Sequence, residues 1–87
     1  MAKVDREIRV ALRAHPDGAV PIVVVLRETT DQLADEVEAA GMIIQSRSLL
    51  SEGLLAGQAD AACVGRLEQM DGVEFVTMDA VQRASML

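Results

Sequence analysis

The chain has 87 residues, of which 51% are apolar and 25% charged, and its 14 acidic residues against 8 basic ones give a net charge of -6. A chain of this length builds one small domain around a single core, and the composition is typical of a globular protein. The negative charge repels phosphate backbones, and the single aromatic residue, Phe75, cannot form a base-stacking platform. These properties exclude a disordered chain and argue against a nucleic-acid partner.

The residue inventory also argues against a metal, a cofactor or a membrane span. Cys63 has no partner for an internal disulfide, and with His15 it provides two of the four ligands that a structural zinc site usually takes. Charges at positions 3, 5, 6, 7, 9 and 13 leave no signal peptide, and no stretch approaches the ~20 apolar residues of a membrane span. We expect a cytoplasmic chain as written, or an extracellular one if it is excised from a secreted precursor.

Residues 1–18 are predicted to form an amphipathic helix and a turn. Asp5 is placed to cap the helix, and the sequence His-Pro-Asp-Gly at its end stops it. The apolar residues that recur at helical spacing are Val4, Ile8, Ala11 and Leu12.

Residues 19–81 are predicted to form the main domain. The segment 21–27, PIVVVLR, is β-branched on both alternating faces, as in a central strand that is covered on both sides. Thr29 begins a helix with Gln32 at the capping-box position, and Gly41 ends it.

The second half of the main domain is predicted to begin with a hairpin. Its strands are 42–50 and 54–57, joined by a Ser-Glu-Gly turn. Asp60 caps a third helix, and residues 73–78, VEFVTM, form the last strand. Residues 82–87 follow as a tail that we expect to be flexible in the free domain.

This order of elements predicts an α+β, ferredoxin-like fold, in which two helices cover one face of a four-stranded antiparallel sheet. The other face has no cover. The first strand is apolar on that face too, as is the last, through either Val73 and Phe75 or Val76 and Met78. An uncovered apolar face suggests a protein partner.

No pattern in the chain indicates an enzyme. His15 lies beside Pro16 in a turn, where a lone histidine is usually solvated. Cys63 is on the core-facing side of its helix, with no basic residue expected beside it to activate the thiol. Five acids and no base lie between Glu28 and Glu38, and this face is either solvated or the contact of a basic partner.

Three segments resemble the propeptide domain of subtilisin-like serine proteases and the free-standing inhibitors related to it. They are PIVVVLR, EVEAAGMII and DAACVGRLEQMDGVEFVTMDAV, and the resemblance extends over residues 21–85. In the last segment the family has an apolar pair in the helix, a helix-ending turn, Val-x-x-Val and an acid. These places are filled by Val64, Leu67, Asp71, Gly72, Val73, Val76 and Asp79.

The resemblance implies a protein that binds and inhibits a subtilisin-like serine protease and assists its folding. The open sheet face would dock on two surface helices of the protease, and the tail would enter the active-site cleft as an extended strand. Family members place acidic side chains at the N-termini of those helices. Asp79 matches one such acid, whereas Thr77 stands at the other place with an uncharged hydroxyl.

The tail residues implied to bind the cleft are Ala84, Ser85, Met86 and Leu87. Such clefts prefer apolar side chains at the residue before the cut and three places earlier, which Leu87 and Ala84 satisfy. An ungapped match places Ser85 at the cut instead, so two registers remain open. We expect a monomer when free, with no catalytic residues.

Two other functions fit the predicted fold. One is a regulatory domain that buries a small molecule, such as an amino acid, between paired domains. The other is an interaction module that uses the sheet edge or the acidic helix. Neither gives a role to the tail, QRASML.

Overall fold

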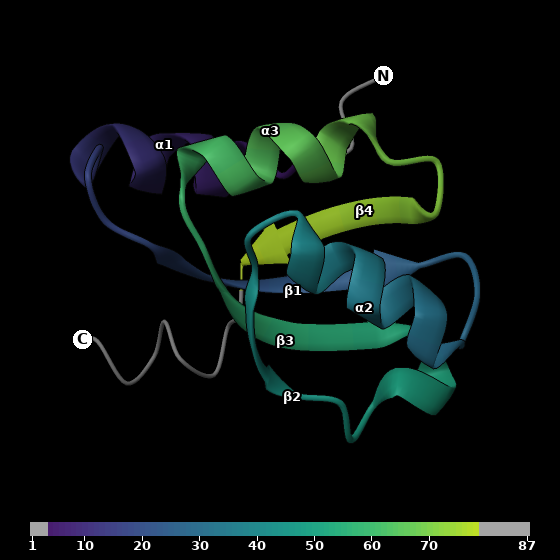
Figure 1. Ribbon diagram of the computed structural model, residues 1–87. Helices are drawn as coiled ribbons and strands as arrows, with labels where there is room; N and C mark the ends of the chain where they lie inside the picture. The colour runs from purple at the N-terminus through teal and green to yellow at the C-terminus, as the bar shows by residue number, and fades with distance from the viewer. Residues whose placement is uncertain (1–3, 79–87) are drawn as a thin grey trace.

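The computed structural model describes residues 4–78. The elements, in chain order, are α1 (Arg6–Ala14), β1 (Val20–Leu26), α2 (Asp31–Ala39), β2 (Ile43–Ser46), the 3-10 turn η1 (Leu50–Glu52), β3 (Leu54–Ala59), α3 (Ala61–Gln69) and β4 (Val73–Met78). The four strands form one antiparallel sheet in the order β2-β3-β1-β4 (Figure 1). This is the predicted ferredoxin-like arrangement, preceded by one helix.

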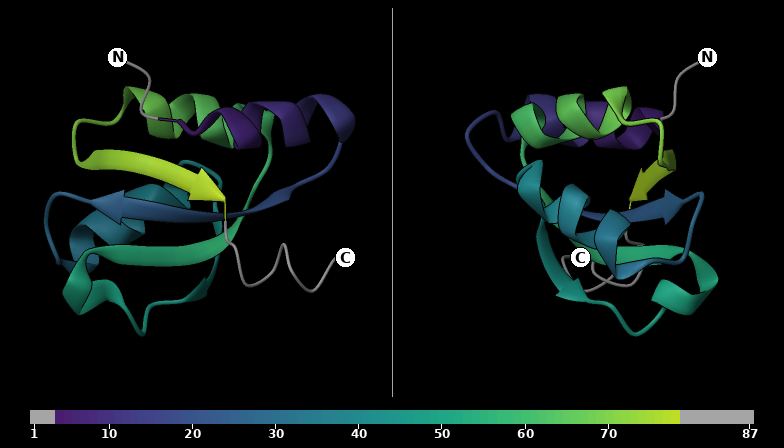
Figure 2. Two further views of the ribbon diagram at one scale, coloured as in Figure 1. Left: turned by 180° about the vertical axis from the view of Figure 1, so that it is seen from behind. Right: turned by 45° about the vertical axis from the view of Figure 1, so that its right-hand side comes forward.

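The core lies between one face of the sheet and the helices. On β1 the even-numbered residues Ile22, Val24 and Leu26 are buried on this side, while Val23 and Val25 point to the other. Helices α2 and α3 turn their apolar sides toward the buried face (Figure 2). Their buried side chains are Leu33, Ala34, Val37, Cys63, Val64 and Leu67.

Helix α1 lies beside α3 at the β4 edge of the sheet (Figure 2). Its Ile8 is completely buried in the same core as the sheet, and Arg9 forms an ion pair with Glu68 of α3. Just before the helix, Val4 bridges to Val76 of β4, and the N–H of Asp5 donates to the Val76 carbonyl (2.9 Å). The chain therefore covers part of the outer edge of β4, which would otherwise be open to strand pairing.

Side-chain caps begin all three α-helices. The Asp5 carboxylate accepts from the N–H of Glu7 (3.1 Å) and the Asp60 carboxylate from that of Cys63 (2.8 Å), as predicted. The prediction for α2 was wrong by one residue, since Thr30 and not Thr29 caps it, accepting from Leu33 (3.2 Å).

The predicted hairpin has different bounds from those expected. Strand β2 ends at Ser46, because the Ser46 hydroxyl accepts from the N–H of Ser48 (3.2 Å) and turns the chain into η1. Gly53 then adopts a left-handed conformation (φ 78°) that returns the chain into β3. Strand β3 runs to Ala59, two residues beyond the predicted end.

Strand β4 resolves the two alternatives left open for its faces. It contains one extra residue at Glu74, because Val25 pairs with Phe75 while Leu26 pairs with Val73. This bulge turns both Val73 and Val76 into the core. Phe75 alone of the four expected apolar residues lies on the open face, as the partner of Val25.

We predict opposite effects from adding a methyl group at two glycines. A Cβ at Gly57 would lie 2.1 Å from the carbonyl oxygen of Ile43, so Gly57→Ala must push β2 away and destabilise the domain by about 1–3 kcal/mol. A Cβ at Gly65 of α3 meets nothing within 4 Å, so Gly65→Ala should stabilise the helix by about 0.5–1 kcal/mol. Urea unfolding measures both variants, and equal midpoints would contradict the β2 to β3 pairing described here.

Candidate functional site

The open face of the sheet is the largest candidate for a binding surface. It consists of the side chains that point away from the helices on all four strands. Cross-strand pairing places them in rows, with Val25 between Leu54 and Phe75, and Val23 between Ala56 and Thr77. We use the name open face for this set, which contains Pro21, Val23, Val25, Ile43, Leu54, Ala56, Gln58, Phe75 and Thr77.

The open face is apolar over most of its area and is only partly shielded from solvent. Phe75 is 38% exposed and Ile43 is 65% exposed, while Val23, Val25 and Leu54 are half-buried by their neighbours. None of the described helices lies over this side (Figures 1 and 2). An exposed apolar surface of this kind is therefore a candidate for a binding site.

Thr77 lies on the open face near the β4 edge, and its hydroxyl has a partner that the sequence did not indicate. The Thr77 hydroxyl donates to Asp5 Oδ2 at 3.3 Å, while the other carboxylate oxygen of Asp5 caps α1. A negative charge thus lies beside Thr77. Residues 5 and 77 are distant in sequence, and only the docking of α1 against β4 brings them together.

The other residues implied to bind a protease, Asp79, Ala84, Ser85, Met86 and Leu87, lie outside the described residues. Strand β4 ends at Met78, so this stretch follows the sheet directly.

The acidic side of α2 is paired within the molecule. Arg47, from the loop after β2, forms ion pairs with Asp35 (2.9 Å), Glu38 (3.4 Å) and Asp31 (3.6 Å). Hydrogen bonding to Asp35 raises the pKa of Arg47 above its ordinary value. These exposed pairs contribute little stability, but they reduce the charge that a basic partner would meet.

The polar groups considered for catalysis lie apart. Cys63 is buried in the core, and His15 is exposed at the end of α1, where its backbone N–H donates to the Ala11 carbonyl (3.0 Å). Desolvation raises the pKa of the Cys63 thiol to about 11. Arg66 opposes this effect, contrary to the expectation that no basic residue lies near Cys63, but burial is the larger influence. Residues 4–78 contain no group of three or more His, Cys, Asp or Glu side chains that could hold a metal ion.

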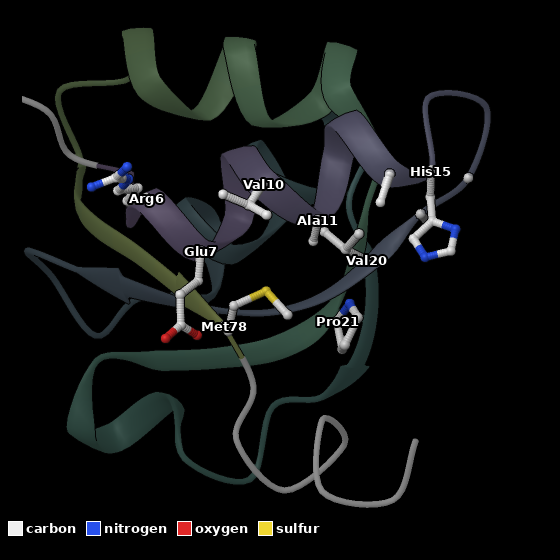
Figure 3. Close-up of a pocket in the computed structure, with 11 residues that line it drawn as sticks. Arg6, Glu7, Val10, Ala11, His15, Val20, Pro21 and Met78 are labelled. Atoms are coloured by element: carbon white, nitrogen blue, oxygen red, sulfur yellow. The ribbon is translucent and has the colours of Figure 1, made fainter. Parts of the chain in front are cut away.

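A hollow lies between α1 and the sheet (Figure 3). It has a volume of about 730 Å³ and an apolar floor, and we call it the α1 groove. Its lining includes Val10, Ala11, Val20, Pro21 and Met78, with Arg6, Glu7 and His15 around them. Val10 is not among the residues of α1 that the sequence analysis assigned to the core. An apolar residue outside that set is the sequence signal that could have indicated the groove.

Comparisons with family models, with curated proteins and with solved structures found no match. Within residues 4–78, none of the helices has both the length and the apolar composition needed to cross a bilayer.

We predict that the buried Cys63 thiol makes stability fall at high pH. The pKa is about 11 in the folded state against 9.0 for a free thiol, so the folded state retains the proton longer than the unfolded state does. The contribution of the protonated thiol to the free energy of unfolding is therefore complete below pH 9 and is lost as the pH rises to 11. The measurement is the urea midpoint across that range, with Cys63→Ala as control. Parallel profiles for the two proteins would contradict the prediction.

Proposed function

We propose that this domain binds and inhibits a subtilisin-like serine protease, and assists its folding, with the open face on the protease surface and the segment 82–87 in the active-site cleft. The observation that carries the proposal is the open face itself. Apolar side chains from all four strands lie there, and no described element covers them. The class of partner comes from the sequence resemblance, which includes the stretch that forms α3 and β4.

The arrangement of the sheet supports a partner on this side. Its helix-facing side is filled, with Ile22, Val24 and Leu55 completely buried, so a partner cannot reach that side without unfolding the domain. The open side is continuous from β4 to β2 and leads at Met78 into the tail sequence. One partner surface can therefore contact the face and receive the tail.

The family pattern has an acid at the position of Thr77 in this chain. Asp5 supplies an acidic group close to that position. Its carboxylate is 3.3 Å from the Thr77 hydroxyl at the edge of the open face. A carboxylate at this edge suits the N-terminus of a partner helix, where free N–H groups and the helix dipole favour negative charge. In this proposal the N-terminal segment completes the docking surface.

The test is a titration of the purified 87-residue protein against a subtilisin-type and a trypsin-type protease. We expect inhibition of the subtilisin type alone. Phe75→Asp replaces the one aromatic side chain of the open face by a charge and should weaken inhibition by about 30-fold or more, as for the loss of an aromatic interface residue. The matched control is Leu49→Asp, at a residue 48% exposed in the loop before η1, which should inhibit like the wild type.

Equal inhibition of both protease classes, or equal effects of the two aspartate variants, would overturn the proposed binding mode. Absence of inhibition together with dimerisation and a melting shift caused by an amino acid would favour the regulatory domain instead.

We predict that two substitutions of Asp5 separate its charge from its capping role. Asp5→Asn keeps a good N-cap but removes the charge, so it should weaken inhibition by about 0.3–1 kcal/mol with little change in melting temperature. Asp5→Ala should weaken inhibition similarly and also destabilise the domain by about 0.5–2 kcal/mol. Inhibition constants and thermal melts of both variants provide the check. Unchanged inhibition by Asp5→Asn would restrict Asp5 to capping α1.

A further inference from the structure

The α1 groove adjoins the open face at Pro21, and we propose that in the free protein it is occupied by the chain's own segment 79–87. The groove lies between α1 and the first residues of β1, whereas the open face spans all four strands. The inference does not depend on protease binding.

The groove has the properties of a site for an apolar chain segment. Val10 is 56% exposed although the residues beside it, Ala11, Val20 and Met78, are apolar. Figure 3 shows Val10 and Ala11 above the groove, with Met78 and Pro21 below it. The volume of about 730 Å³ is within the range of sites that enclose several side chains. Filling it would remove Val10 from water.

The chain reaches the groove without a linker. Met78, the last described residue, is itself part of the lining, so residue 79 begins at the groove. The nine residues that follow reach about 30 Å when extended. Helix α1, which forms one wall, is nine residues and therefore about 13 Å long. The segment is long enough to follow the whole wall.

The composition of the segment matches the lining. Five of its nine residues are apolar, namely Ala80, Val81, Ala84, Met86 and Leu87. The lining is also mostly apolar, and its charged residues, Arg6 and Glu7, lie at the N-terminal end of α1. Because the segment is covalently attached at the rim, its local concentration is high, and a shallow apolar contact is enough to hold it.

The sequence analysis predicts a flexible tail, whereas here the tail is held in the groove. The sequence alone does not reveal the groove that the tail would contact. If the domain also binds a protease through its tail, the segment must leave the groove first.

The test is hydrogen exchange of residues 80–87 in the full 87-residue protein, compared with a synthetic peptide of residues 79–87. We expect exchange in the protein to be slower than in the peptide by about tenfold or more. Val10→Asp should restore the peptide rate, because it places a charge in the groove wall at an exposed site that the fold does not need. Leu49→Asp, a similarly exposed site away from the groove, should keep the protection.

Each other result overturns the proposal. Peptide-like exchange in the wild type means that the groove does not hold the segment, and protection that survives Val10→Asp means that the segment is bound elsewhere. Protection that is lost on dilution, with a halving of mass in sedimentation, assigns the groove to the tail of a second copy. Native mass spectrometry can also detect a small molecule on the purified protein. If neither variant displaces that molecule, the groove is the site of a ligand and not of the segment.

Discussion

Strand β1 is hydrogen-bonded to β3 along one edge and to β4 along the other, and these two pairings position every other part of the molecule. Its residues must satisfy both faces of the sheet at once. Ile22 and Val24 belong to the core, while Val23 and Val25 form the centre of the open face. The β-branched sequence that makes β1 a good central strand is thus also what makes the open face apolar.

The unequal covering of the sheet follows from the connections. Both crossover helices of a split βαβ unit pack on the same side, because right-handed connections return the chain over one face. An added helix could have covered the other face, but α1 lies at the β4 edge beside α3 and leaves it open. The position of α1 has two consequences: it brings Asp5 to Thr77, and it forms the wall of the groove at Met78.

Three of the reactive or charged side chains, Cys63, Arg47 and Arg66, have structural roles. Burial keeps the Cys63 thiol protonated, and Arg47 lies among the carboxylates of α2. Arg66 of α3 donates to the Ala40 carbonyl (3.0 Å) at the end of α2, where it satisfies a backbone group that the helix leaves unpaired.

The sequence by itself determined the order of elements, the caps at Asp5 and Asp60, and the presence of an apolar face beyond the core, because these depend on local propensity and on the period of two along a strand. It could not determine which residues of β4 face outward. The bulge at Glu74 shifts the alternation, and it arises only from pairing with β1. Equally, Asp5 and Thr77, or α1 and Met78, become neighbours only when the N-terminal segment packs against β4. Contacts between distant residues are set by how the helices fill the space beside the sheet, and a local sequence pattern contains no information about that packing.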